Sequence, residues 1–337
     1  MIIREYLKLA RSFNAVLTGI SPVMGAIAMQ DYNLFHLFLL FLVGFLGHTY
    51  GFVLNDIVDF RIDKNCEEIS DRPLISGTIS LRKAWVFAAV SMVAAFVVAF
   101  YIAFSTQRFF PLIVLVVSAF FITVYDLISK KLPGMDVFVA LGIFFLILYG
   151  AVTVVGDLTE VTLLAWIVCL LGSIQVLFMQ FIAGGMKDIE NDFKSGAKTL
   201  AVKMGVRVVN GVLRVSFGFK TLAYTLQIID IILVFMHFLF IPGFTIVTVL
   251  RYLQWMLLIL IAGLMMFFSH KLLGLERFDR DVVRKYIGLH YYTNFALVPV
   301  MLMTLNPWII VLMVFPALGF ILSNLILHGT ILQPKTM

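Results

Sequence analysis

The chain has 337 residues, of which 62% are hydrophobic and only 13% are charged, and its mean hydropathy is +1.04. Soluble proteins average about 25% charged residues, so this composition excludes an ordinary soluble domain and indicates several membrane-spanning helices. The net charge is +6, and the two cysteines, Cys66 and Cys169, lie far apart. They therefore imply neither a disulfide framework nor a thiolate metal centre.

Long apolar runs follow one another along the chain, and each is long enough to cross a bilayer as a helix. Residues 1–11 form a basic amphipathic lead that we expect on the membrane surface. Because more spans follow the first run, that run is not a cleaved signal peptide. The expected spans are 12–30, 34–56, 83–104, 109–128, 135–155, 161–186, 208–239, 249–270, 286–305 and 308–328.

Lysine and arginine are distributed unevenly between the two sides of these spans. With the N-terminus in the cytoplasm, almost all of them fall on the cytoplasmic side, and only Arg108 and Arg251 lie outside. This bias predicts the orientation by the positive-inside rule. It also explains the basic residues without nucleic acid as a partner, and it places the polar segments described next on the cytoplasmic side.

The first polar segment is Asn55 to Gly77, NDIVDFRIDKNCEEISDRPLISG, where the second span ends. Asp56, Asp59 and Asp63 are spaced by three and four residues, so they share one face if the helix continues through them. Carboxylates beside membrane spans are costly and are usually functional. The proline that follows Arg72 prevents a plain helix there and turns Arg72 back toward the acids.

The second polar segment is Lys187 to Thr199, KDIENDFKSGAKT, where the sixth expected span ends. Asp188 and Asp192 are four residues apart, and Gly184-Gly185 precede them. Asp56 and Asp188 are 132 positions apart, and each ends an even-numbered span. We therefore interpret the chain as a single transmembrane domain of two similar halves, 11–128 and 135–270, with an additional C-terminal span at 306–328.

Converging carboxylates without His or Cys suit Mg²⁺, which binds a few carboxylates, waters and substrate phosphates. The acids therefore predict that a diphosphate is held through Mg²⁺. A diphosphate leaves readily from an allylic carbon, and the 33 Phe, 11 Tyr and 4 Trp can line a dry cavity for the resulting cation. The cations expected to balance the remaining charge are Arg72, Lys130, Lys187 and Lys198.

The two acidic segments resemble the paired signatures of the UbiA superfamily of intramembrane prenyltransferases, N-D-x-x-D-x-x-x-D and D-x-x-x-D, over roughly residues 11–305. The resemblance implies nine helices, or ten with the C-terminal span, in a ring around a central cavity. It implies Mg²⁺-dependent transfer of a prenyl group, geranylgeranyl or similar, from its diphosphate to a lipophilic or aromatic acceptor.

Site residues follow from the same resemblance. Asp56, Asp59, Asp63, Asp188 and Asp192 would bind Mg²⁺, and Asn55, Arg72 and Lys187 would contact the diphosphate. Tyr125 and Lys130 look like the family's element beside the reacting carbon, and Arg11 and Asn14 look like the polar start of its first helix. Asp56, Asp59, Asp188, Asp192 and Tyr125 would be catalytic.

Several alternatives stay open. A secondary transporter could use membrane acids for ion coupling, and a structural membrane protein could recruit a partner through acidic loops. The acceptor could be an aromatic acid, a naphthoate, a chlorin or a glycerol phosphate lipid of the archaeal type. The mixed charges of residues 271–285 predict a solvated, salt-bridged turn and not a site.

Overall fold

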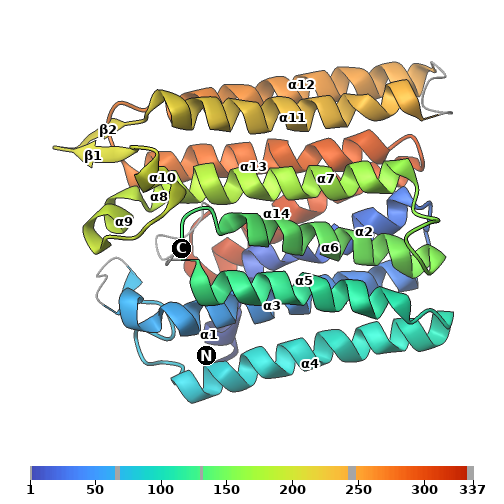
Figure 1. Ribbon diagram of the computed structural model, residues 1–337, viewed down its shortest axis with the longest axis horizontal. Coiled ribbons are helices and arrows are strands. Elements are labelled where there is room, and N and C mark those ends of the chain that lie inside the picture. The colour runs from blue at the N-terminus through green and yellow to red at the C-terminus, as the bar shows by residue number, and fades with distance from the viewer. Residues whose placement is uncertain (1, 65–68, 130–131, 242–247, 332–337) are drawn as a thin grey trace. The chain divides into compact units, whose positions relative to one another are not determined.

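The structure is a computed structural model that describes residues 2–64, 69–129, 132–241 and 248–331. Helices make up most of it, with one two-stranded sheet among the described residues (Figure 1). The all-α membrane fold predicted from the apolar runs is confirmed. The chain divides into two compact units, which are described separately: Met1–Leu127, Leu141–Ala165 and Val314–Met337 form the first, and Ile128–Ala140 and Trp166–Met313 form the second.

The first unit is built mainly from seven helices. The predicted spans agree with them in place, and the second span is longer than expected because its helix continues through the first acidic segment. The helices are α1 Ile2–Leu9, α2 Ser12–Ala28, α3 Leu34–Asp63, α4 Leu81–Thr106, α5 Phe110–Ile128, α6 Asp136–Val155 and α14 Val311–His328.

Helix α4 has one face for lipid and another for the protein. Its valines at positions 86, 90, 93 and 97 are 57–62% exposed, which is costly in water and favourable in hydrocarbon. The opposite face consists of small buried residues, which let α4 pack closely against α3. These residues are Ala84, Ala88, Ser91, Ala95 and Ala99.

Helices α2 and α6 meet backbone to backbone at two glycines. A Cβ atom on Gly150 would lie 1.8 Å from the Pro22 carbonyl oxygen, and one on Gly25 would lie 2.0 Å from the Ile147 carbonyl oxygen. Atoms cannot approach so closely, so only glycine fits at either position. The contact fixes α2, which carries the start of the site, against the rest of the first unit.

The second unit contains shorter elements beside its long helices. In chain order, the long and short elements of this unit are α7 Leu163–Phe178, the π-helix η2 Met179–Gly184, α8 Gly185–Lys187, α9 Ile189–Ser195, α10 Leu200–Lys203, β1 Arg207–Val209, β2 Val212–Arg214, α11 Phe217–Phe240, α12 Val249–Leu273, α13 Arg280–Leu302 and the 3₁₀-helix η3 Pro307–Ile310. π-Helices are rare and often occur at functional sites. Here the π-helix immediately precedes the second acidic segment.

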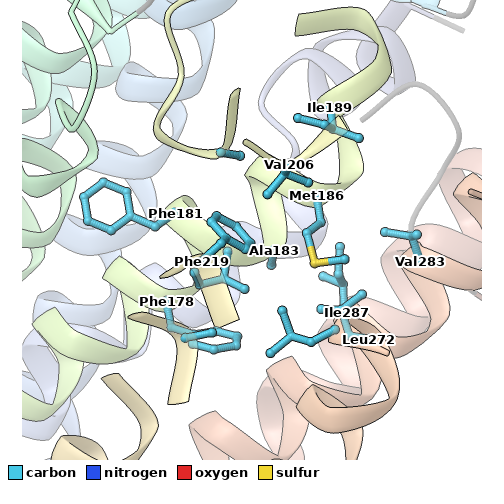
Figure 2. Close-up of a cluster of buried hydrophobic side chains, with 14 of the residues drawn as sticks. Phe178, Phe181, Ala183, Met186, Ile189, Val206, Phe219, Leu272, Val283 and Ile287 are labelled. Carbon is cyan, nitrogen blue, oxygen red and sulfur yellow. The ribbon is translucent and has the colours of Figure 1, made fainter. Parts of the chain in front are cut away.

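A hydrophobic cluster anchors that segment (Figure 2). Met186 and Ile189, which flank Lys187 and Asp188, are completely buried in it. Phe178 and Phe181 join the cluster from the preceding turns, and α10, α11, α12 and α13 contribute Ala201, Phe219, Leu272, Val283 and Ile287. Burying side chains of this size contributes about 1.5–3 kcal/mol each, so the segment is held by packing on both sides of its acids.

The strands β1 and β2 correct the prediction of a helix from residue 208. Asn210 and Gly211 join the strands with φ angles of 52° and 76°, the pair of positive values that a two-residue hairpin turn requires. Arg207 pairs with Arg214 in the antiparallel register. The helix begins later, at Phe217, where the Ser216 hydroxyl accepts a hydrogen bond from the Phe219 N–H at 3.2 Å.

Eight of the described helical stretches are long and apolar enough to cross a membrane: Leu34–Arg61, Leu81–Thr106, Phe110–Ile128, Asp136–Val155, Leu163–Lys187, Phe217–Phe240, Val249–Leu273 and Pro307–His328. The apolar part of α2, Asn14–Ala28, is shorter. Helix α13 begins with the charged sequence RDVVRK and is not among the eight. The total of nine or ten spans stays a prediction, as does the repeat of two halves.

Candidate active site

The three aspartates of the first segment lie in the last turns of α3. Because α3 stays helical to Asp63, Asp56, Asp59 and Asp63 share one face. All three are buried. A buried carboxylate is stable only when it is paired or hydrogen-bonded, so the residues around these acids decide what they can do.

Two arginines lie against this acidic face. Arg11 donates from Nη2 to Asp56 Oδ1 at 2.7 Å, and Arg72 donates from Nη1 to Asp63 Oδ2 at 2.7 Å. The same Arg72 nitrogen is 3.6 Å from Asp56 Oδ1. Arg72 was predicted from the sequence; Arg11 was identified there only as part of the polar start of the first helix.

The local backbone explains how each arginine reaches the acids. Arg11 immediately precedes α2, and it adopts a left-handed conformation with φ 44° and ψ 47°. Arg72 begins a loop held by hydrogen bonds from the Ser76 N–H to the Arg72 carbonyl and from the Ile79 N–H to the Pro73 carbonyl. Leu74 and Ile79 of this loop pack in a hydrophobic cluster with Val53 and Ile57 of α3.

Asp126 of α5 is a fourth acid in this region, and the sequence prediction omitted it. It is buried, and its carboxyl group lies beside the Asn55 side chain and near Asp59 and Asp56. The preceding residue, Tyr125, is half-buried. The signal that could have revealed Asp126 is an acid at the end of a span on the same predicted side as the first segment.

The remaining predicted residues of the first unit are placed as follows. Asn55 lies on α3 beside Asp126. Asn14 is half-buried in the first turn of α2, and its backbone N–H donates to the Arg11 carbonyl at 2.9 Å. The structure thus brings Asn55, Arg72 and the three aspartates together. Lys130 lies outside the described residues.

In the second segment, Asp188 stands at a break between two short helices. Its φ and ψ of −100° and 5° separate α8 from α9. Lys187 Nζ is 3.3 Å from Asp188 Oδ2, and Arg280 Nη2 is 3.1 Å from Asp188 Oδ1. The Asp192 N–H donates to the Asp188 carbonyl at 2.8 Å, which places Asp192 one turn further along. Asp192 is half-buried and Lys198 is exposed.

Arg280 is the second residue that the sequence prediction missed. It belongs to residues 271–285, which were interpreted as a solvated turn. That turn does contain an ion pair of its own, from Arg284 Nη1 to Asp281 Oδ1 at 2.7 Å. Arg280 instead contacts an acid 92 positions earlier in the chain. Local charge patterning cannot reveal a partner at that distance.

The donor chemistry of both segments fits Mg²⁺ bound together with a phosphate ligand. Among the described residues, no group of three or more His, Cys, Asp or Glu side chains could hold a metal ion. Mg²⁺, however, is usually bound by one or two carboxylates with waters and substrate phosphates. The candidate ligands are all carboxylates, which are the hard oxygen donors that Mg²⁺ prefers.

Comparison with known proteins identifies relatives of this chain by sequence and by fold. The sequence profile of the UbiA prenyltransferase family matches residues 15–284. The digeranylgeranylglyceryl phosphate synthase of Pyrococcus horikoshii is 29% identical over 223 residues, which cover 65% of this chain and 75% of that protein.

Two solved structures share the fold. A UbiA homolog from Aeropyrum pernix superimposes with a TM-score of 0.66 at 16% identity, covering 88% of this chain and 98% of that chain. A UbiA homolog from Archaeoglobus fulgidus, solved with GPP and Mg²⁺, gives a TM-score of 0.62 at 19% identity and covers 87% of this chain and 99% of that chain.

Proposed function

The chain belongs to the UbiA prenyltransferase family, and from this premise we propose that it transfers a geranylgeranyl-type group from its diphosphate to a hydroxyl of a glycerol phosphate lipid. It is an integral membrane enzyme. Its relative from Pyrococcus horikoshii is named for a product that carries two geranylgeranyl groups and a phosphate. Because the diphosphate departs in a prenyl transfer, that phosphate must come from the acceptor.

The observation that carries the proposal is a set of acids already covered by cations in each unit. Arg11 and Arg72 contact Asp56 and Asp63 in the first, and Lys187 and Arg280 contact Asp188 in the second. Ion-coupling acids of a transporter are expected near the bilayer midplane in broken helices. Acids at helix ends beside arginine suit an anionic ligand better.

The chemistry requires one bond to break and one to form. The allylic carbon–oxygen bond breaks and the electron pair leaves with the diphosphate, then the acceptor hydroxyl oxygen bonds to the carbon and releases its proton. Mg²⁺, when bound, would neutralise charge on the leaving diphosphate. In our assignment Asp56, Asp59, Asp63, Asp188 and Asp192 hold the metal; the groups around the phosphates and the reacting carbon are Asn14, Asn55, Arg72, Tyr125, Lys130, Lys187 and Lys198.

The orientation is part of the proposal. The N-terminus and both acidic segments would face the cytoplasm, where the water-soluble head of a prenyl diphosphate is accessible and its tail can lie among the helices. The lysine and arginine bias supports this side.

The test is to incubate purified protein with Mg²⁺, radiolabelled geranylgeranyl diphosphate and a panel of acceptors. The panel contains a geranylgeranyl glycerol phosphate lipid, an aromatic acid, a naphthoate and a chlorin. We expect a product only with the glycerol phosphate lipid, and a chelator should stop its formation until Mg²⁺ is restored. Transfer to another acceptor would contradict the acceptor, and transfer that ignores the chelator would contradict the metal.

Variants locate the site in the same assay. Asp56→Asn and Asp188→Asn should each lower the rate by about 100-fold or more, because metal-assisted stabilisation of a leaving group is worth several kcal/mol. Asp71→Asn is the matched control, since Asp71 is an exposed acid of the first polar loop. Activity close to that of the control in both variants would defeat the site assignment.

A further inference from the structure

We propose that Arg280 is a phosphate-binding residue of the second acidic segment, which exchanges Asp188 for a ligand phosphate when metal and substrate bind. The inference rests on the proposed function. It assigns a role to a residue that neither the acidic signatures nor the charge pattern of residues 271–285 indicates.

Both carboxylate oxygens of Asp188 face a cation. Oδ1 faces Arg280 Nη2 at 3.1 Å, and Oδ2 faces Lys187 Nζ at 3.3 Å. The Asp188 side chain is nevertheless 36% exposed, whereas Arg280 and Lys187 are 18% and 13% exposed. A carboxylate that is to ligate a metal must release at least one oxygen. The released cation then needs another anion, and the phosphate that accompanies the metal provides it.

The start of α13, where Arg280 lies, is fixed by a helix cap and by packing. The preceding residue, Asp279, caps the helix: its Oδ1 accepts from the Asp281 N–H at 2.9 Å and from the Val282 N–H at 3.2 Å. One turn later, Arg284 pairs with Asp281. Val283 is completely buried in the hydrophobic cluster of Figure 2. The backbone of Arg280 is therefore held by a cap before it and a buried side chain after it.

The β-hairpin supports the chain segment that leads to Arg280. The Leu213 N–H donates to the Glu276 carbonyl at 2.9 Å, and the Phe278 N–H donates to the Gly211 carbonyl at 3.0 Å. Val212 and Arg277 form an antiparallel bridge between these two bonds. The segment before Arg280 thus adds an edge to the hairpin, and the buried Leu213 ties that edge to the same hydrophobic cluster.

Arginine suits this role because its planar fork forms two parallel hydrogen bonds to a phosphate. A solvent-exposed ion pair contributes little to folding stability. Stability alone therefore does not explain why a helix cap and a hairpin hold the backbone around Arg280. The ligand phosphate could belong to the prenyl diphosphate or to the glycerol phosphate head of the acceptor. We assign it to the diphosphate, because Asp188 is the proposed metal ligand and metal and diphosphate bind together.

The experiment compares Arg280→Ala and Arg280→Lys with Arg277→Ala, an exposed arginine of the same loop. Binding is measured with a non-hydrolysable geranylgeranyl thiolodiphosphate plus Mg²⁺ and, separately, with the glycerol phosphate lipid. Mn²⁺ binding without any phosphate ligand is followed by electron paramagnetic resonance.

We expect Arg280→Ala to weaken thiolodiphosphate binding by about 10- to 100-fold, the usual effect of losing a charge-assisted hydrogen bond. Arg280→Lys should recover part of this, and Arg277→Ala should match the wild type. Mn²⁺ alone should bind Arg280→Ala at least as tightly as the wild type, because a competitor for Asp188 is gone.

Each other outcome is decisive. Weakened binding confined to the glycerol phosphate lipid upholds the phosphate role and moves its source to the acceptor. Unchanged binding of both ligands overturns the inference and leaves the proposed function standing. Lower Mn²⁺ affinity together with a lower melting temperature, and no recovery by lysine, shows a structural role and overturns it too. A wild-type protein that binds no thiolodiphosphate overturns both proposals.

Discussion

Arg11 occupies a backbone conformation that side chains other than glycine seldom adopt. Its φ of 44° lies in the left-handed region, which costs roughly 1–2 kcal/mol for an L-residue. The compensation is visible in its surroundings: the guanidinium contacts Asp56 at 2.7 Å and stands over the Phe52 ring, 4.9 Å from its centroid. Strain of this kind concentrates at functional sites, which is consistent with a role for Arg11 beyond the joint between α1 and α2.

Asp31, in the loop between α2 and α3, predicts a pH effect on stability. Burial raises the pKa of this carboxyl, but hydrogen bonds from the His36 ring and the Asn33 N–H outweigh burial, so the pKa is lowered overall. A lowered folded-state pKa means that the contribution is complete above the unfolded pKa of about 3.9 and is lost as pH falls through the folded pKa.

Asp31→Asn should therefore lower the free energy of unfolding at pH 7 by at most about 1 kcal/mol, because the pair is partly solvated. The difference from the wild type should disappear as the pH falls below about 4. Melting curves in detergent at several pH values measure this, with the exposed Glu160→Gln as the control. A difference that persists unchanged at the acidic end would contradict the assignment.

At the scale of elements, the glycine contact between α2 and α6 makes a sharp prediction. Gly150→Ala should prevent normal folding, because its Cβ would meet the Pro22 carbonyl oxygen at 1.8 Å and backbone cannot move aside cheaply. The control is Gly47→Ala on α3, where nothing lies within 4 Å of the added Cβ. The control should be neutral or slightly stabilised, since alanine is the better helix former.

The measurement is the amount of folded protein in the membrane and its melting temperature. Equal yields and melting temperatures for Gly150→Ala and Gly47→Ala would show that α2 and α6 are further apart than described.

The long helices were predictable because their apolar runs have no competing interpretation. The hairpin was not, because its apolar residues at positions 208, 209, 212 and 213 continue the hydrophobic pattern of α11, and three-residue strands offer almost no period. Only the Asn210-Gly211 turn distinguishes them. Within the candidate site, the aspartates were predicted from their spacing along the helix, and Arg72 was predicted from the proline that follows it. Arg280 and Asp126 were not, because Arg280 pairs with Asp188 and Asp126 lies beside Asn55, and both partners are far away in the sequence.

At the scale of the whole molecule, the two arginines expected on the outer side have structural roles. Arg108 donates to the Thr153 and Val154 carbonyls at the end of α6, where the helix dipole favours a cation. Arg251 donates to Gln254 and Thr304 at 2.7 and 3.0 Å. Each is thus explained by polar groups around it, and neither opposes the proposed orientation.

The sequence-based expectation that both acidic segments bind one diphosphate can be tested by a distance measurement. The background carries Cys66→Ser, and the buried Cys169 should not react with the label. Spin labels are then attached at two exposed positions, Arg61→Cys on α3 and Asn191→Cys on α9. We expect one narrow distance distribution that shortens when Mg²⁺ and a non-hydrolysable prenyl diphosphate are added. Segments on opposite leaflets would be separated by about 30 Å or more, the thickness of the hydrocarbon core, and such a distance would contradict a shared ligand.

The cations that rest on the aspartates have one more consequence. In the proposed site, a metal ion that binds Asp56 or Asp188 competes with the arginine paired to that acid, and a diphosphate arriving alone finds these arginines already paired with carboxylates. Loading is then heterotropic: each ligand raises the affinity for the other by the same factor. If the proposed site is correct, the enzyme without a prenyl diphosphate would bind little divalent metal, and binding of the donor would raise its affinity for the metal.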